Sequence, residues 1–200
     1  MSTKINISYF KAPIRNTQPY KDVSPSDVAK VIKGNFFKEK TDNLRELSDV
    51  DEVRKYKSDN FDYVTFSGTF TERKKTALVE YSSLIALDFD HVDVESTKNK
   101  ILNQKDINTV LLFVSPSGDG IKWIVPSTTK DEHEKVFRMY QRYCKELFDL
   151  DVDESGKDIA RACFIPHDPN VVYNETFEFR KLEKYWNEPT ASTPKQKQRY

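Results

Sequence analysis

Short runs of apolar residues are spread along the chain, and their patterns predict strands and helices. In the segment 4–10, apolar Ile5, Ile7 and Tyr9 alternate with polar residues, which is typical of a strand. Further strands are predicted at 61–66, 84–89, 108–114, 121–125, 161–166 and 176–180. The strand at 121–125 returns after a turn that contains two glycines, so it should form a β-hairpin with the strand before it.

Helices are predicted where apolar residues recur at helical spacing. Residues 24–27 (Ser-Pro-Ser-Asp) are typical of a helix start, and this helix should end near Gly34. The segment 43–56 is strongly charged with one apolar stripe, which predicts a solvated helix. Helices are also predicted at 95–105 and at 129–150, the second with a continuous apolar face and acidic residues in its first turns.

The run 84–93 changes abruptly from apolar to acidic residues. Because side chains alternate along a strand, Asp88 and Asp90 should point to one face, while Phe89 points into the core. Two carboxylates at the end of a buried strand repel each other and lose hydration, and a divalent cation is the simplest compensation. The sequence therefore predicts a metal site here, and replacing both carboxylates should relieve repulsion and leave the fold intact.

The predicted glycine-containing hairpin has a composition that suits an anion. Gly118 and Gly120 lie among small polar residues that include Ser115 and Ser117, so backbone amides can converge on a phosphate. Lys122 can add a point charge. The segment is not a Walker A loop, because the residues after it alternate like a returning strand and do not open a helix. A purely structural hairpin is the alternative.

An acid-rich turn follows the long helix and offers a third carboxylate. Its first residues match an EF-hand loop, but Ala162 occupies the twelfth position, where that loop needs a bidentate Glu. An EF-hand is therefore excluded. Either Asp153 or Asp158 could instead complete the predicted metal site, with Arg161 facing a phosphate. A solvated turn is the alternative.

Two other polar segments carry weaker chemical signals. Residues 67–75 bring a glycine and the cations Arg73, Lys74 and Lys75 ahead of the acidic strand, and they form either an exposed turn or a loop that faces a phosphate. His167 could act as a ligand or a base, although a lone histidine in a polar turn is usually only solvated.

The composition limits the class of protein. The 200 residues are 37% hydrophobic, which suffices for one substantial core and excludes a disordered chain. Lys+Arg and Asp+Glu balance at 32 each, so any contact with nucleic acid must come from local patches. Cys144 and Cys163 lack metal-ligand spacing and indicate buried thiols in a reducing compartment. Without a signal-peptide region or a membrane-spanning run, the protein is expected in the cytoplasm, with no membrane partner.

The order of these motifs resembles the archaeo-eukaryotic primase superfamily, and within it the VirE-type N-terminal, primase-polymerase-like domains of mobile-element replication proteins. The resemblance rests on Asp-x-Asp at 88–90, Ser-x-Ser-Gly-x-Gly-x-Lys at 115–122 and Phe-Ile-Pro-His-Asp-Pro-Asn at 164–170. The segment 65–70 also resembles that subfamily, and the similarity as a whole covers 61–174.

The resemblance implies an α/β (α+β) fold with a mainly antiparallel, RRM-like catalytic sheet flanked by helices. It also implies nucleotidyl transfer of the DNA primase/polymerase type, with single-stranded DNA as template, nucleoside triphosphates as substrates and two Mg²⁺ or Mn²⁺ ions as cofactors. The metal ligands would be Asp88, Asp90 and Asp153, with Asp158 as the other candidate for the third catalytic acid. The nucleotide-binding residues would be Ser115, Ser117, Gly118, Gly120, Lys122 and Arg161.

The sequence departs from the superfamily at Lys122, where most members have a histidine, and two other functions stay open. One is a catalytically degenerate, primase-like module that binds nucleic acid or a replication partner, which the neutral net charge also favours. The other is a phosphatase of the haloacid-dehalogenase type, because an Asp-x-Asp after an apolar strand is also the nucleophile motif of that family.

Three regions are predicted along the chain. Residues 1–60 should form a strand and helices that pack on the core, 61–185 the primase-polymerase-like core, and 186–200 a flexible tail or linker. A polar end of this kind is typical of a domain cut from a longer protein, and a helicase domain or protein is a further expected partner.

Overall fold

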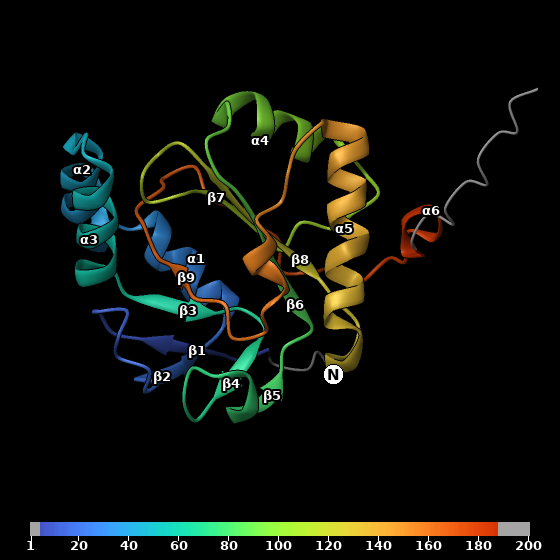
Figure 1. Cartoon of the computed structure of the whole chain (residues 1–200), viewed down its shortest axis with the longest axis horizontal. Coiled ribbons are helices and arrows are strands. Elements are labelled where there is room, and N and C mark those ends of the chain that lie inside the picture. Colours follow the sequence, from blue (N-terminus) through green and yellow to red (C-terminus); the bar gives the residue numbers. More distant parts are fainter. Residues whose placement is uncertain (1–4, 188–200) are drawn as a thin grey trace, which may run out of the picture.

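The computed structural model of the protein describes residues 5–187 and combines strands with helices (Figure 1). The strands are β1 (Ile7–Phe10), β2 (Lys21–Val23), β3 (Tyr63–Thr65), β4 (Gly68–Phe70), β5 (Leu78–Tyr81), β6 (Leu84–Phe89), β7 (Leu111–Val114), β8 (Ile121–Pro126), β9 (Cys163–Phe164) and β10 (Val172–Tyr173). The α-helices are α1 (Pro25–Lys33), α2 (Lys38–Glu46), α3 (Val50–Asn60), α4 (Val94–Asn103), α5 (His133–Phe148) and α6 (Glu183–Trp186). Short 3-10 turns are η1 (Asn35–Phe37), η2 (Lys75–Ala77), η3 (Lys130–Glu132) and η4 (Glu154–Lys157). The tail predicted at 186–200 lies outside the described residues from 188 onward.

The strands form three sheets in which every pair of neighbours is antiparallel. An N-terminal sheet has the strand order β2-β1-β3-β9, a central sheet has the order β10-β7-β8-β6, and β4 pairs with β5. The expected α+β class with mainly antiparallel pairing is confirmed. Within residues 5–187, no helix combines the length and the apolar character needed to cross a membrane.

The central sheet separates two apolar clusters. Along β6, Ile85, Leu87 and Phe89 face the cluster that contains α5 and part of α4. Leu84 and Ala86 face the other cluster, which includes the N-terminal sheet and α1 (Figure 1). Because side chains alternate, the next residue of this second series is at position 88, on the side of the N-terminal helices. Phe89 is fully buried, as the alternation predicted.

Several predicted elements are confirmed. Helix α1 begins with a capping box, in which the Asp27 amide donates to Ser24 Oγ and the Ser24 amide donates to the Asp27 carboxylate, each at 3.1 Å. The helix ends before Gly34, as expected. The hairpin of β7 and β8 and the long helix α5 also form where the sequence placed them.

The single helix predicted at 43–56 is wrong, because the structure has two helices, α2 and α3, in its place. The carboxylate of Asp49 accepts hydrogen bonds from the amides of Asp51 and Glu52 and so caps a new helix. An N-cap residue has a non-helical backbone, and this interrupts a continuous helix.

The strand predicted at 176–180 is also wrong. Strand β10 forms earlier and pairs with β7, and the side chain of Asn174 then donates to the Thr109 carbonyl at 2.7 Å. Beyond that point Phe177 packs against one apolar cluster and Phe179 against the other. Phe177 and Phe179 therefore pack on two separate clusters, and the segment does not form a strand.

Close contact between η4 and β6 brings the acid-rich turn to the central sheet. The Asp153 amide donates to the Asp88 carbonyl at 2.9 Å. At Gly156 a Cβ atom would lie 2.8 Å from the Ala86 carbonyl oxygen and 2.7 Å from the Phe137 ring. Only glycine allows the turn to approach β6 this closely.

We expect Gly156→Ala to lower the free energy of unfolding by about 1–3 kcal/mol, because the added methyl group overpacks the contact with β6. Urea denaturation measures the change. Gly34→Ala is the control, since the nearest atom to its Cβ would be the Lys30 carbonyl oxygen at 3.1 Å, and its loss should be smaller. Equal losses for the two variants would show that the turn moves away from β6 without penalty.

Candidate metal centre

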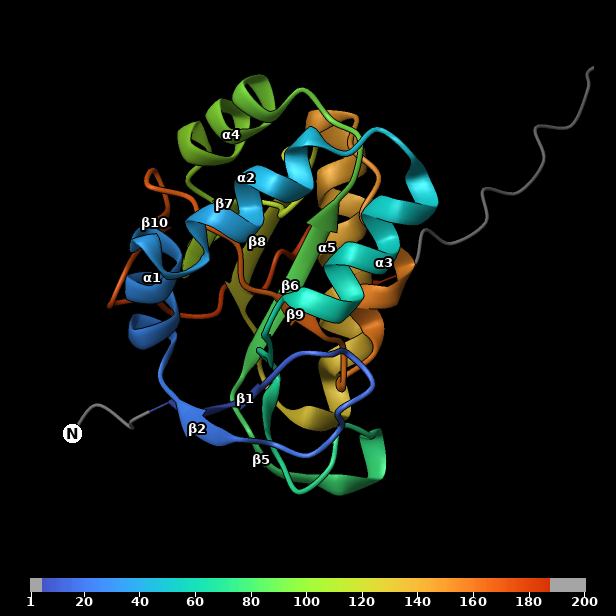
Figure 2. The ribbon, with the colours of Figure 1, turned by 90° about the vertical axis from the view of Figure 1, so that its left-hand side faces the viewer.

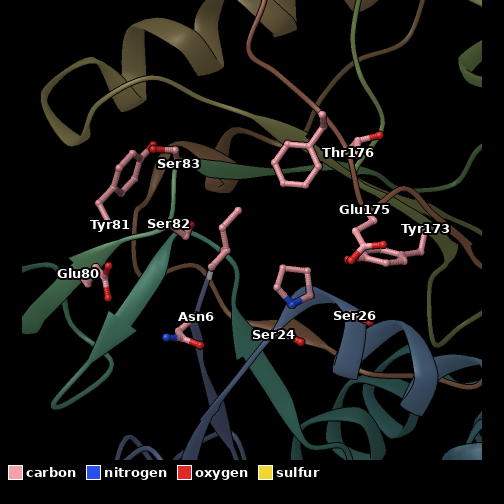
Figure 3. Close-up of a pocket in the computed structure, with 13 residues that line it drawn as sticks. Asn6, Ser24, Ser26, Glu80, Tyr81, Ser82, Ser83, Tyr173, Glu175 and Thr176 are labelled. Atoms are coloured by element: carbon pink, nitrogen blue, oxygen red, sulfur yellow. The ribbon is translucent and has the colours of Figure 1, made fainter. Parts of the chain in front are cut away.

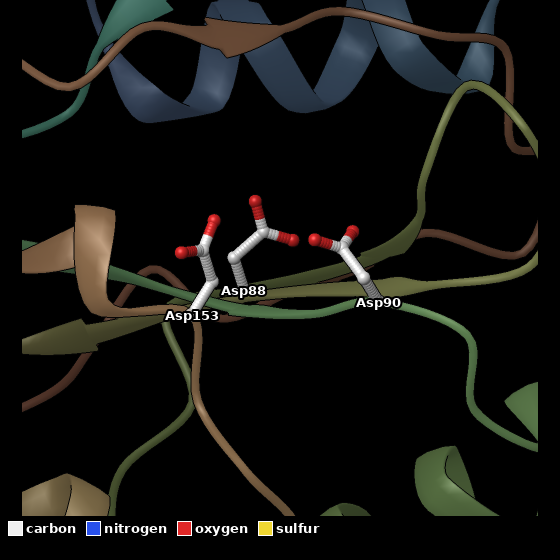
Figure 4. A group of neighbouring side chains, drawn as sticks. All are labelled: Asp88, Asp90 and Asp153. Atoms are coloured by element: carbon white, nitrogen blue, oxygen red, sulfur yellow. The ribbon is translucent and has the colours of Figure 1, made fainter. Parts of the chain in front are cut away.

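Three carboxylates meet where β6 ends (Figure 4). Asp88 lies on β6, Asp90 follows the strand, and Asp153 immediately precedes η4. One oxygen of each carboxylate lies within 4.8 Å of the others. Asp88 is buried, Asp153 is half-buried and Asp90 is exposed, so the group extends from the core to the surface.

The geometry distinguishes between the two candidates for the third acid. Asp153 belongs to the carboxylate group, whereas Asp158 does not. The exposed side chain of Asp158 accepts a hydrogen bond from the Ala160 amide at 3.0 Å and so stabilises its own turn. The sequence left both residues open, and tertiary contacts bring only Asp153 to Asp88 and Asp90.

Two cations contact these carboxylates. Lys122 lies directly across from Asp88 in the β6–β8 pairing, and its Nζ contacts Asp88 Oδ1 and lies 3.9 Å from Asp90 Oδ1. Arg161 Nη2 lies 3.2 Å from Asp88 Oδ2 and 3.1 Å from Asp153 Oδ2. Asp88 is therefore held between two positive charges. Lys122 and Arg161, which the sequence assigned to phosphate binding, thus contact the carboxylates in this structure.

Lys57 of α3 is a third cation near the group, and the sequence gave no sign of it. Burial lowers the pKa of Lys57, and the charge of Lys122 lowers it further, while the charges of Asp90, Asp119 and Asp88 oppose the shift. The charges of the carboxylate group and of Lys122 thus act on the pKa of Lys57. Apolar residues of α3 pack on the same cluster as Leu84 and Ala86, and this packing directs the helix toward the Asp88 face.

Asp153 is fixed by Ser155 as well as by Arg161. The Ser155 amide donates to Oδ1 at 3.0 Å and the Ser155 hydroxyl donates to Oδ2 at 2.6 Å. Burial raises the pKa of Asp153, but these hydrogen bonds and the charges of Arg161 and Lys122 outweigh burial and lower the pKa below its ordinary value. The carboxylate is therefore ionised at neutral pH, which is the form that binds a cation.

The glycine-containing hairpin closes on itself beside the carboxylates. Ser117 Oγ donates to Asp119 at 2.6 Å, and Ser115 Oγ lies 3.2 Å from Ser117 Oγ. Asp119 also lies 2.7 Å from His91 Nδ1. Burial raises the pKa of Asp119, but the contacts with Ser117 and His91 lower it overall. The hydroxyls of the two serines that the resemblance assigns to nucleotide binding are thus engaged within the hairpin.

Two contacts hold this hairpin in place. At Gly120 a Cβ atom would lie 2.5 Å from the Phe89 carbonyl oxygen, so glycine allows β8 to begin close to the end of β6. Arg45 of α2 donates to the Pro116 carbonyl at 3.1 Å and to the Ser115 carbonyl at 3.2 Å. The N-terminal helices thus position the hairpin from outside.

His167 and Arg73, for which the sequence gave weaker chemical signals, make contacts that hold the fold together. His167 Nδ1 is 2.9 Å from the Gly34 carbonyl oxygen, and the His167 amide donates to Thr41 Oγ1, so the residue links the end of α1 to α2. Arg73 donates to the Tyr63 hydroxyl at 3.1 Å and to the Ile14 carbonyl at 3.2 Å. The Arg73 contacts join its loop to the N-terminal sheet. Neither His167 nor Arg73 belongs to the carboxylate group.

A cavity of about 840 Å³ lies between the ends of several segments (Figure 3). Its walls come from the chain around Asn6, Ser24, Ser82 and Thr176. The charged side chains that line it are carboxylates, and none of the three aspartates of the carboxylate group contributes to it. The cavity is therefore a separate feature of the fold.

The family model described as BT4734-like, N-terminal domain matches residues 55–173. The chain belongs to this family. The matched segment of the chain begins within α3 and ends in β10. It therefore contains Lys57, the three aspartates, the hairpin and Arg161. No curated protein and no solved structure matches the chain.

The cations revise the expectation that removing the carboxylates only relieves repulsion. Asp88→Asn deprives Lys122, whose side chain is 13% exposed, of its nearest counter-charge. Because breaking a buried ion pair costs about 3–5 kcal/mol, we expect a loss near 3 kcal/mol in the free energy of unfolding, measured by urea denaturation. Asp90→Asn is the matched control, since its carboxylate is exposed, and its effect should stay within about 0.5 kcal/mol.

Combining Asp88→Asn with Lys122→Met removes both charges and should recover most of that stability. Equal stability of Asp88→Asn and the wild-type protein would show that the pair contributes nothing to folding. If the double variant is no more stable than Asp88→Asn, the instability of Asp88→Asn does not come from an unpaired charge on Lys122.

Proposed function

We propose that this chain is a nucleotidyltransferase of the DNA primase/polymerase type, which makes or extends primers on single-stranded DNA. The observation that carries the proposal is the group of Asp88, Asp90 and Asp153, with one oxygen of each within 4.8 Å of the others, next to a glycine-containing hairpin. Nucleotidyl transfer requires divalent cations, and hard cations prefer carboxylate oxygens. A role in mobile-element or phage replication follows from the resemblance on which this proposal builds.

The succession of elements around the group supports a primase-polymerase-type sheet. The central sheet and its helices follow one another as β6, α4, β7, β8, α5 and β10, which is the βαββαβ succession of split βαβ folds. As in those folds, the first and third strands of the succession lie side by side, here with Asp88 on one and Lys122 on the other. The last strand pairs with β7 and not with β6, which is a variation on that plan.

The donor set fits Mg²⁺ or Mn²⁺, because all three side chains offer carboxylate oxygens. Asp90 is exposed and its nearest cation is 3.9 Å away, whereas Asp88 and Asp153 share their oxygens with Lys122 and Arg161. Bound ions would neutralise the triphosphate and activate the attacking hydroxyl.

Lys122 and Arg161 would exchange partners when a nucleotide binds. Each contacts Asp88 in this structure, and the oxygens of a triphosphate offer each of them another anion. Their transfer to phosphate would free carboxylate oxygens for the cation ligands. Lys57 would add a third positive charge from α3.

A second candidate is a module that binds nucleic acid or a replication partner without catalysis. Lys122 and Arg161 already compensate much of the charge of Asp88, Asp90 and Asp153 without a metal ion. A cluster that neutralises itself in this way can be purely structural. A phosphatase of the haloacid-dehalogenase type is a third candidate, which the same experiment separates.

The decisive experiment is primer synthesis and extension on single-stranded DNA with Mn²⁺ and labelled nucleotides. We expect product from the wild-type protein and a loss of more than about 100-fold in Asp153→Asn, since changes outside the ligand shell already cost 10- to 100-fold at metal sites. Asp158→Asn is the matched control, because it removes a carboxylate from the same turn but outside the group. That variant should retain most of the activity.

The other outcomes decide between the candidates. DNA binding without product from any variant would favour the binding module, and release of phosphate from simple esters would favour the phosphatase. Calorimetric titration with Mn²⁺ gives an independent measure, in which Asp153→Asn should bind more weakly than Asp158→Asn. Equal binding by the two variants would remove Asp153 from the ligands.

A further inference from the structure

Two aromatic side chains are exposed together in the N-terminal part of the chain. Tyr20 is 64% exposed and Phe36 is 70% exposed. Lys11 Nζ lies 5.4 Å from the centroid of the Tyr20 ring and 5.7 Å from that of the Phe36 ring. The two rings therefore gather around one ammonium group and form a single patch, in contrast to the scattered apolar residues that are normal on a surface.

Lys11 is held in place between the rings by a buried carboxylate. Its Nζ lies 2.9 Å from Asp62 Oδ2, and Asp62 also accepts hydrogen bonds from the Tyr9 hydroxyl and the Ala12 amide. Burial raises the pKa of Asp62, but these hydrogen bonds and the Lys11 charge lower it below its ordinary value. Asp62 is thus ionised at neutral pH and fixes the lysine, so the patch is preorganised.

A second lysine lies beside the patch. Lys21 Nζ is 5.9 Å from the centroid of the Tyr9 ring, and Lys11 Nζ is 5.3 Å from the same ring. Lys21 is exposed and has no ion-pair partner among residues 5–187. The surface therefore combines two open aromatic rings with an available positive charge.

The loop that joins β1 to β2, which lies between Lys11 and Tyr20 in the chain, contacts helix α3. The Ile14 amide, in the loop between β1 and β2, donates to the Ser58 carbonyl of α3 at 2.7 Å. The residue before Ser58 in that helix is Lys57, whose pKa the charge of Asp90 raises against the opposing effects of burial and Lys122. Figure 2 shows α3 above the loop that joins β1 to β2, on the same side of the molecule. A strand lying on this loop could continue past α3 to the carboxylates.

We propose that Tyr20, Phe36, Lys11 and Lys21 form a surface that binds single-stranded DNA. Bases would stack on the exposed rings, and the ammonium groups would contact phosphates. An apolar protein partner would cover the rings and leave Lys21 without a counter-charge, whereas a single strand supplies aromatic faces and negative charge together. The patch lies outside residues 55–173 matched by the family model, so it is independent of the family assignment. Only the use of the bound strand as a template rests on the proposed function.

The test is fluorescence anisotropy of a labelled oligothymidylate titrated with the full chain in EDTA, at two salt concentrations. We expect Tyr20→Ala combined with Phe36→Ala to weaken binding by about 10-fold or more, because base stacking on one ring is worth about 5- to 150-fold. Tyr20→Phe restores the ring and should bind more tightly than Tyr20→Ala. Lys21→Ala should weaken binding and reduce the salt dependence by about one phosphate contact.

Leu147→Ala is the control, because this residue of α5 is 51% exposed and lies outside the patch, and its DNA affinity should equal that of the wild-type protein. Unchanged affinity of the double aromatic variant would overturn the proposal. A change in oligomeric state with unchanged DNA affinity would also overturn it and identify a protein interface.

Failure of the two proposals can be told apart. Ring-dependent binding without any primer product would confirm this surface and contradict nucleotidyl transfer. Primer product together with ring-independent binding would support nucleotidyl transfer and overturn the surface. Asp153→Asn, which should lose activity, is expected to bind the oligothymidylate in EDTA through the same rings.

Discussion

The antiparallel pairing of β6 with β8 is the interaction on which the candidate metal centre depends. Its register sets Asp88 opposite Lys122, and the alternation of side chains turns both toward the N-terminal helices. A slip of β6 by one residue against β8 would turn Asp88 into the apolar cluster beneath α5 and leave Lys122 on the opposite face of the sheet. The hydrogen bonds that build the core therefore also determine which charges meet.

The charges around Asp88 are balanced before any ligand is bound. Lys122 and Arg161 each contact its carboxylate, and α3 adds Lys57 from the opposite layer. In the proposed function, a metal ion and a triphosphate would bind cooperatively. The triphosphate would bind Lys122 and Arg161, and the metal ion would bind the carboxylate oxygens that these two cations release. The N-terminal segment would then contribute both a cation at the centre and a surface for the DNA strand.

The sequence alone determined the features that depend on neighbouring residues. The capping box of α1 closes within four residues of Ser24, and the burial of Phe89 follows from alternation along one strand. The hairpin of β7 and β8 and the joint position of Asp88 and Asp90 were predictable for the same reason. Each of these features needs only local backbone geometry.

The tertiary structure decided which residues from distant parts of the chain lie near Asp88 and Asp90. Asp153 and Asp158 are equivalent in sequence, and only the contact of the Asp153 amide with β6 selects between them. Lys57 carries no motif, because its position depends on the packing of α3 against the apolar cluster that also contains Leu84. Segments such as 176–180 have strand-like alternation that packing overrides. Contacts between residues far apart in the chain depend on the assembled core, and no local pattern encodes them.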